Sequence, residues 1–161
     1  MMESQKTPLR VLLTDDDEGD RLVFQEIFDE METVTSIRMV NDGKQLMNVL
    51  RNESQPLPHI IFLDLNMPDM NGIECLKEIR SQEKYNKISI AIYSTSTSEK
   101  DIDETFHHGA NIYITKPGDY NELKQVLAKS LSAVRLSRES DFDRDNFVLS
   151  STSAKLQIDV V

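Results

Sequence analysis

The chain has 161 residues, of which 28 are acidic and 18 basic, with a formal net charge of −10, and it contains one cysteine. A chain of this length is typical of one domain and can bury a core without cross-links. The composition therefore excludes a disulfide-rich secreted scaffold and favours a cytoplasmic protein. The acidic balance argues against DNA binding, and no apolar run approaches the roughly 18 residues of a membrane span.

Short apolar runs alternate with amphipathic segments from residue 8 onward. The apolar runs predict five strands, at Leu9 to Thr14, Ser36 to Val40, His59 to Leu63, Ile88 to Tyr93 and Ala110 to Ile114. Apolar residues at helical spacing predict a helix after each strand, around residues 22–31, 46–50, 73–79, 102–106 and 120–134. Strict alternation of this kind implies right-handed crossovers and a parallel sheet with helices on both faces, which is a doubly wound α/β fold.

The two ends of the chain are predicted to lie outside this fold. We divide the chain into an N-terminal extension (1–7), one domain (8–137) and a C-terminal tail (138–161). The tail mixes serine and aspartate with isolated apolar residues and has no helical period. Two alternatives stay open for it: a tail that is flexible or docks on a partner, or a docked strand at Phe147 to Leu149 or at Leu156 to Val161.

Acidic side chains follow two of the predicted strands. The first strand ends in the acidic run Asp15 to Glu18, and the third strand is followed by Asp64. In a doubly wound sheet the carboxyl ends of the strands meet at one edge, so Asp15, Asp16 and Asp64 are expected to converge there. Such carboxylates repel one another unless a cation lies among them, and Mg²⁺ prefers oxygen ligands of this kind. The sequence therefore predicts a magnesium site at this edge.

A hydroxyl group and an ammonium group reach the same edge. The fourth strand leads into Ser94 and Thr95, and the fifth strand is followed by Lys116. Together with the acids, these groups supply what phosphoryl transfer to a carboxylate requires: a nucleophile, a metal ion, and further groups that stabilise the charge on the phosphoryl oxygens. Asp17 and Asp20 are instead interpreted as solvated acids that cap the start of the first helix.

The strand-end residues resemble those of the response-regulator receiver domains of bacterial two-component signalling, and the similarity covers nearly all of residues 8–137. The pair Asp15–Asp16 resembles the acid pair of that family, and Ile60 to Pro68 resembles the phosphoacceptor segment around Asp64. Further positions of the family pattern are matched by Gly72, Ser94, Lys116 and Pro117. The resemblance implies a flavodoxin-like sheet with strand order 2-1-3-4-5 and five helices.

The resemblance also implies a mechanism. Asp64 would accept a phosphoryl group from a phosphohistidine and form an aspartyl phosphate. Mg²⁺ would be held by Asp16, Asp64 and the backbone carbonyl of Asn66, while Asp15 would act mainly through water. Lys116 would pair with Asp64 before the transfer and with a phosphoryl oxygen after it.

The same resemblance places a conformational switch at the ends of the fourth and fifth strands. Ser94, with Thr95 beside it, would bond a second phosphoryl oxygen, and Tyr113 would rotate inward into the space that Ser94 leaves. Pro117 is expected in a turn or after a cis peptide bond. Three departures from the family pattern leave the lifetime of the aspartyl phosphate open: serine at 94, threonine at 95 where alanine is frequent, and Gly118 in place of an aromatic residue.

The partners follow from the resemblance as well. A sensor histidine kinase or a phosphotransfer protein would donate the phosphoryl group. A downstream protein would bind the fourth helix, fifth strand and fifth helix, which also offer a surface for a homodimer. No output module follows residue 137, so we expect a stand-alone regulator, similar to those associated with phytochrome-type kinases, and not an enzyme with an external substrate. The alternatives are a phosphorelay intermediate and a haloacid-dehalogenase-like phosphatase, although the latter needs a second aspartate where this chain has Asn66.

Overall fold

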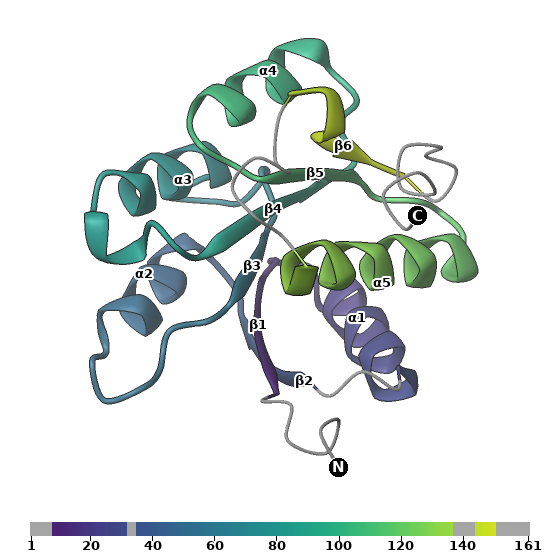
Figure 1. Cartoon of the computed structure of the whole chain (residues 1–161), viewed down its shortest axis with the longest axis horizontal. Coiled ribbons are helices and arrows are strands. Elements are labelled where there is room, and N and C mark those ends of the chain that lie inside the picture. The colour runs from purple at the N-terminus through teal and green to yellow at the C-terminus, as the bar shows by residue number, and fades with distance from the viewer. Residues whose placement is uncertain (1–7, 32–34, 137–143, 151–161) are drawn as a thin grey trace.

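The computed structural model describes residues 8–31, 35–136 and 144–150. In these residues six strands form one parallel sheet in the order β2-β1-β3-β4-β5-β6 (Figure 1). The strands are β1 (Leu9–Thr14), β2 (Thr35–Val40), β3 (Ile60–Leu63), β4 (Ser89–Ser94), β5 (Ile112–Thr115) and β6 (Val148–Leu149). The helices are α1 (Glu18–Glu30), α2 (Gly43–Arg51), α3 (Gly72–Arg80), α4 (Glu99–His107) and α5 (Tyr120–Leu136), with short 3-10 turns η2 (Glu83–Tyr85) and η4 (Arg144–Asn146).

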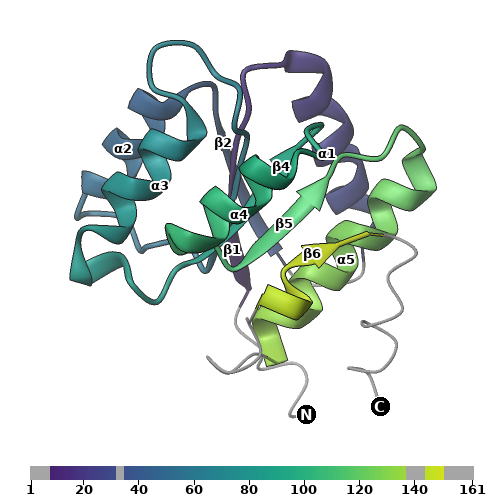
Figure 2. The ribbon, with the colours of Figure 1, turned by 90° about the horizontal axis from the view of Figure 1, so that it is seen from above.

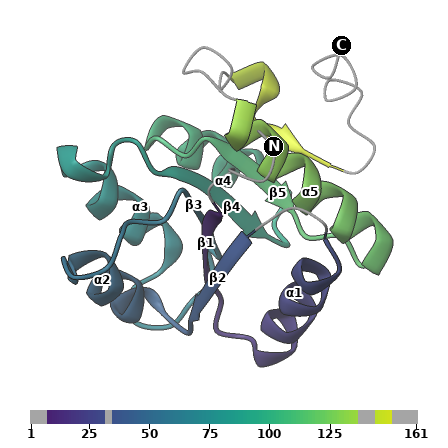
Figure 3. The same ribbon diagram turned by 60° about the horizontal axis from the view of Figure 1, so that its bottom comes forward.

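Two layers of helices cover the sheet. Helices α1 and α5 lie on one face, whereas α2, α3 and α4 lie on the other (Figure 1, Figure 3). The predicted doubly wound, flavodoxin-like α/β fold with five helices and strand order 2-1-3-4-5 is thus confirmed, and the sixth strand is an addition to it. None of the helices in the described residues is long and apolar enough to cross a membrane.

The centre of the sheet is buried on both faces. All the residues of β3 are buried, and neighbours such as Ile60 and Ile61 belong to two different apolar clusters, one toward α1 and α5 and one toward α2, α3 and α4. A strand that is covered on both faces appears in a sequence as an uninterrupted apolar run. The edge strand β2 differs, because it carries exposed Ser36 and Arg38. Burial on both faces therefore explains the uninterrupted apolar sequence of β3.

Side-chain caps begin the helices. Asn71 accepts a hydrogen bond from the Glu74 amide (3.0 Å), and the Glu74 carboxylate accepts one from the Asn71 amide (2.9 Å), which makes a capping box. The other N-terminal caps are Asp17 for α1, Asp42 for α2, Ser98 for α4 and Asp119 for α5. These caps fix where each helix leaves the carboxyl end of the preceding strand.

Strand β5 begins later than predicted. Helix α4 ends at His107, and the amide of Ala110 still donates to the carbonyl of Thr105 (3.0 Å). Between them, Gly109 adopts a φ of 99°, a left-handed conformation that glycine reaches without steric cost. Ala110 therefore belongs to the turn that ends the helix, and β5 runs over Ile112–Thr115 instead of the predicted 110–114.

Residues 144–150 join the domain. They form η4 and β6, and β6 pairs in parallel with β5 and lies beside it in Figure 2. Phe147, which precedes β6, is fully buried. For residues 144–150 the structure has the second of the two alternatives, a docked strand, which spans Val148–Leu149. The N-terminal extension 1–7 and the other candidate strand, at Leu156 to Val161, lie outside the described residues.

Candidate functional site

Four neighbouring strands bring polar side chains to the same edge of the sheet. Asp15 follows β1, Asp64 follows β3, Ser94 ends β4, and Lys116 follows β5. These strands are adjacent and parallel, so their carboxyl ends lie together, and the strand order reverses between β1 and β3. The structure therefore brings together the strand-end residues that the sequence singled out.

The acids form a compact cluster at this edge. Carboxylate oxygens of Asp15, Asp16 and Asp64 lie within 4.8 Å of one another. Asp15 is fully buried and Asp64 is 6% exposed, whereas Asp16 is exposed to solvent. Backbone amides orient the two buried carboxylates: Asp17 N donates to Asp15 Oδ1 (2.9 Å), and Asn66 N donates to Asp64 Oδ1 (3.2 Å). Both buried acids are thus held in fixed orientations.

Lys116 is the cation of the cluster. Its ammonium nitrogen lies 3.0 Å from Asp15 Oδ2, 2.9 Å from Asp20 Oδ2 and 3.6 Å from Asp64 Oδ2. The ammonium also lies over the ring of Tyr93, 4.6 Å from its centroid. Only 12% of the lysine side chain is exposed. Because little water separates these charges, the lysine offsets much of the repulsion among the carboxylates.

The cluster shifts the pKa values of its members. Burial raises the pKa of Asp64 to about 6, and the nearby Asp15 adds to this rise, so the opposing effect of Lys116 does not restore the usual value. Burial also raises the pKa of Asp15, although the Asp17 amide and Lys116 counteract it. Burial alone would lower the pKa of Lys116, but the hydrogen bond with Asp20 and the charges of Asp64 and Asp15 outweigh it and raise that pKa. At neutral pH the site therefore pairs an ionised but easily protonated Asp64 with a permanent ammonium group.

The donor set fits a hard divalent cation. The clustered groups are carboxylates only, with oxygens within 4.8 Å of one another. Oxygen ligands are those that Mg²⁺ and Mn²⁺ prefer, whereas zinc sites usually contain histidine or cysteine. Mg²⁺ also keeps several water ligands, which the exposed position of Asp16 allows. The residues present can therefore hold the predicted cation.

Ser94 and Tyr113 are connected through the loop after β4. The Ser94 side chain is buried, and its Oγ accepts a hydrogen bond from Ser96 N (3.1 Å). Tyr113 is also buried, and its hydroxyl donates to the carbonyl of Ser96 (2.9 Å). Thr95, between the two serines, is exposed. The ring that was expected to rotate inward thus already lies inside in this structure.

Two local features shape the loops that follow Asp64 and Lys116. Gly72 packs against the backbone, and a Cβ atom there would overlap the Asp64 carbonyl and Leu65. Its amide donates to the Leu65 carbonyl (3.0 Å), so the glycine allows α3 to close the loop after Asp64. No peptide bond in the described residues is cis. Of the two expectations for Pro117, only the turn between β5 and α5 therefore remains.

Asp20 is the member of the site that the sequence interpretation missed. That interpretation assigns Asp20 to the solvated start of α1, but its Oδ2 lies 2.9 Å from the ammonium nitrogen of Lys116. The neighbouring prediction is confirmed, because Asp17 caps α1 by accepting the Asp20 amide (2.9 Å). Asp20 lies three residues after this cap and so returns to the same side of the helix one turn later. That spacing is the signal that could have found it.

Comparisons with known proteins cover most of the chain. The family model described as the response regulator receiver domain matches residues 11–128. The chain is similar to the response regulator Rcp1 of Synechocystis sp., with 28% identity over 79% of this chain and 89% of Rcp1. It is also similar to the probable methanogenesis regulatory protein FilR2 of Methanothrix harundinacea, with 28% identity over 74% of this chain and 79% of FilR2.

Solved structures of response regulators are also similar to this chain. The phosphorylated cyanobacterial phytochrome response regulator RcpA is similar with a TM-score of 0.73 and 30% identity, over 81% of this chain and 96% of RcpA. The Mn²⁺-bound form of Rcp1 is similar with a TM-score of 0.71 and 27% identity, over 81% of this chain and 96% of Rcp1. One structural relative thus carries a phosphoryl group, and another holds a divalent cation.

Proposed function

Because the chain belongs to the response regulator receiver family, we propose that Asp64 accepts a phosphoryl group from the phosphohistidine of a sensor histidine kinase or of a phosphotransfer protein. The observation that carries this proposal is the position of Asp64, a buried carboxylate grouped with Asp15, Asp16 and Lys116 where the strand order reverses. A carboxylate that served stability alone would gain nothing from two like charges beside it, because their repulsion is unfavourable.

In the proposed transfer, an Asp64 oxygen attacks the phosphorus atom. The new O–P bond forms as the P–N bond of the phosphohistidine breaks, and the imidazole leaves with the electron pair of that bond and takes up a proton. With a pKa of about 6, Asp64 is ionised at neutral pH and needs no general base. Lys116, 3.6 Å from Asp64 Oδ2, would pair with one phosphoryl oxygen, and the Ser94 hydroxyl would donate to another.

Mg²⁺ is the cation that we propose for the acidic cluster. When bound, it would neutralise the charge of the carboxylates and of the incoming phosphoryl oxygens. Asp16 and Asp64 would be direct ligands together with the backbone carbonyl of Asn66, and Asp15 would act mainly through water. The oxygen-only donor set supports this proposal, as does the Mn²⁺-bound form of the similar protein Rcp1.

The proposed output is a change in protein contacts, without turnover of an external substrate. Ser94 and Tyr113 both bond to Ser96, so a change at Ser94 on phosphorylation would reach β5 and the loop before α4. We therefore assign the downstream protein to the surface of α4, β5 and α5, and a homodimer through the same elements is a further hypothesis. Transfer of the phosphoryl group onward, as in a phosphorelay, is the alternative output.

Intact-mass measurement tests the proposal. After incubation with Mg²⁺ and acetyl phosphate, we expect the wild-type protein to gain the mass of one phosphoryl group, and we expect no gain when Mg²⁺ is chelated. Asp64→Asn should show no adduct, whereas the control Asp29→Asn, an exposed acid on α1, should keep it. An equal adduct on Asp64→Asn, or none on the wild type, would contradict the proposal.

A further inference from the structure

Residues 144–150, hereafter the docked segment, occupy the edge of the sheet beside α4. We propose that the docked segment is the resting occupant of the α4–β5 surface, and that phosphorylation of Asp64 releases it and exposes this surface to a protein partner. The inference rests on the proposed function, since that function assigns the downstream contact to the same elements. Beyond the proposed function, it states that a segment of this chain covers the surface and that a partner protein has to displace this segment.

Apolar contacts hold the docked segment on both faces of the sheet. The ring of Phe147 is fully buried, with its centroid 5.2 Å from that of Phe106 on α4 and 6.0 Å from that of Tyr113 on β5. Leu149 is 4% exposed and belongs to the apolar cluster that includes Leu127 of α5. Aromatic burial of this kind is a strong source of binding energy. The docked segment therefore covers apolar side chains that would otherwise be available to another protein.

Backbone pairing closes the sheet edge as well. The amide of Tyr113 donates to the carbonyl of Phe147 (2.8 Å), and β6 continues the parallel ladder with β5. A strand at the edge of a sheet presents unpaired amides and carbonyls, to which another chain can bind. Because the docked segment satisfies this edge within the same chain, a protein that binds at β5 has to compete with it.

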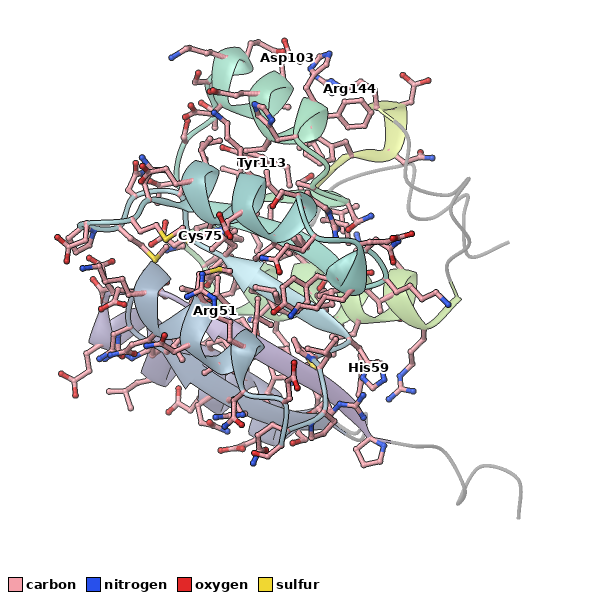
Figure 4. The ribbon with its side chains drawn as sticks, turned by 90° about the vertical axis from the view of Figure 1, so that its left-hand side faces the viewer. Arg51, His59, Cys75, Asp103, Tyr113 and Arg144 are labelled. Atoms are coloured by element: carbon pink, nitrogen blue, oxygen red, sulfur yellow. The ribbon has the colours of Figure 1, made fainter. Side chains whose placement is uncertain are left out.

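Charges orient the docked segment along α4. Arg144 Nη2 lies 2.8 Å from Asp103 and 3.5 Å from Glu99, and Figure 4 shows Arg144 next to Asp103. The side chains of Arg144 and Asp103 are 41% and 53% exposed, so water and salt weaken their attraction. These ion pairs therefore orient the docked segment but add little to the free energy of docking, so they do little to oppose its release.

A short series of contacts links the docked segment to the proposed phosphorylation site. Ser94 Oγ accepts from Ser96 N (3.1 Å), the Tyr113 hydroxyl donates to the Ser96 carbonyl (2.9 Å), and the Tyr113 ring packs against Phe147. The Ser96 hydroxyl also donates to Asp101 on α4 (2.6 Å). If Ser94 turns toward a phosphoryl oxygen, it gives up its hydrogen bond with Ser96, and the loop after β4 and α4 can shift, which would loosen the packing of Phe106 against Phe147. Such coupling is reciprocal, so loss of docking should favour phosphorylation.

Amide hydrogen exchange reports the docking directly. Because the Tyr113 amide is bonded to Phe147, its exchange should be slow in the resting protein. With Mg²⁺ and beryllofluoride, a mimic of the phosphoryl group, we expect the amides of Tyr113 and of residues 147–149 to exchange about tenfold faster or more. Amides of the central strand β3 should not change and serve as the internal reference.

Variants separate docking from the rest of the fold. Phe147→Ala should accelerate exchange at Tyr113 by about tenfold without any mimic and should bind beryllofluoride with Mg²⁺ more tightly than the wild type. Arg144→Glu leaves the apolar contacts in place and should give a smaller acceleration, and it provides the test if Phe147→Ala does not fold. The matched control is Leu22→Ala, which removes a 64% exposed leucine from α1 and should change neither measurement.

Each outcome bears on a separate claim. If the protein takes up a phosphoryl group but Tyr113 stays protected with beryllofluoride, release of the docked segment is wrong. If it takes up none, the proposed function fails and release fails with it, while Phe147→Ala still tests the docking. A dimeric mass in gel filtration that becomes monomeric in Phe147→Ala would mean that the segment docks on a second copy, and it would overturn docking within one chain.

A second inference comes from the ion pairs of Lys116. Its ammonium nitrogen lies closer to Asp20 Oδ2 (2.9 Å) than to Asp64 Oδ2 (3.6 Å). The Asp20 side chain is 42% exposed on the first turn of α1, so it can exchange this partner for water. We infer that Asp20 is a positioning residue that holds Lys116 and competes for it with the phosphoryl group on Asp64. This inference also rests on the proposed function.

Binding of beryllofluoride, followed by fluorine NMR at saturating Mg²⁺, tests the role of Asp20. Asp20→Asn should bind the mimic about two- to fivefold more tightly than the wild type, which is the effect of losing one partly exposed ion pair. Asp20→Glu should return the affinity to the wild-type value, and Asp29→Asn should not change it. Equal affinities in Asp20→Asn and the wild type would overturn the inference, whereas a wild type that does not bind the mimic would contradict the proposed function.

Discussion

Two clusters in this molecule pair one cation with several carboxylates, and they differ in burial. Lys116 meets its carboxylates at 2.9 to 3.6 Å with only 12% of its side chain exposed. Arg144 meets the acids of α4 at 2.8 and 3.5 Å with 41% of its side chain exposed. The distances are alike, so the surroundings of the charges account for any difference in their effects.

Ion pairs of similar length have different effects in the two clusters because one cluster is buried and the other is exposed. Exposed charges a few ångströms apart attract weakly because water and salt screen them, whereas charges with little water interact strongly and lose their hydration. In the buried cluster, this loss raises the pKa of Asp64 to about 6 even though Lys116 is near. The buried cluster therefore keeps a reactive carboxylate in place, while the exposed cluster orients a segment that can leave.

Lys116→Met should have the largest effect on stability. The change leaves Asp15 and Asp64 buried beside each other without a cation, so we expect the free energy of unfolding to fall by about 3 to 5 kcal/mol at neutral pH. The loss should be smaller at about pH 4.5, where carboxylates with raised pKa values bind protons. Urea unfolding followed by circular dichroism measures both. The control Lys124→Met removes an exposed pair with Glu30 (3.1 Å) and should lose far less stability, because water and salt screen exposed charges. Equal losses in Lys116→Met and Lys124→Met would show that burial does not strengthen the charge interactions of Lys116.

Asp64→Asn should stabilise the protein when divalent cations are absent. Because the pKa of Asp64 is raised, the folded protein binds more protons than the unfolded chain between pH 3.8 and about 6. The free energy of unfolding therefore falls as pH rises through this range, and the full destabilisation by the ionised Asp64 is present above it. We expect the free energy of unfolding to rise by about 1 to 3 kcal/mol at about pH 7.5 and to stay near the wild-type value at about pH 3.5. Urea unfolding at the two pH values measures this. A variant that is less stable than the wild type at the higher pH would contradict the description of the buried cluster.

Arg144→Ala should have the smallest effect. Its ion pairs are partly exposed, so we expect a loss of less than about 1 kcal/mol at low salt, and the loss should shrink as salt is added. Urea unfolding at low and high ionic strength measures it. A loss as large as that of Lys116→Met, or one that salt does not reduce, would remove the contrast between the clusters.

The part of the site that could be predicted from the sequence depends on topology alone. Asp15, Asp64 and Lys116 directly follow apolar runs, and parallel strands bring their carboxyl ends to one edge whatever the details of packing. The order of the first five strands follows from the family resemblance in the same way. The start of β5 was misplaced because Gly109 and the end of α4 decide it, and these depend on local backbone geometry.

The features that the sequence leaves open or does not predict depend on contacts between distant residues. Strand β6 is too short to show an alternating pattern, and it forms where Phe147 finds a place between Phe106 and Tyr113. Asp20 joins the cluster only because the first turn of α1 faces Lys116. Helix direction and the docking of a short segment are set by tertiary packing, which a local pattern does not contain.

The central claim, that Asp64 is the phosphoacceptor, is tested most directly by locating the acyl phosphate. Borohydride reduces an aspartyl phosphate to homoserine, and peptide mass spectrometry then identifies the position that was modified. After incubation with Mg²⁺ and acetyl phosphate, we predict conversion at Asp64 and at no other aspartate. Conversion at Asp15 or Asp16 with none at Asp64 would contradict the claim.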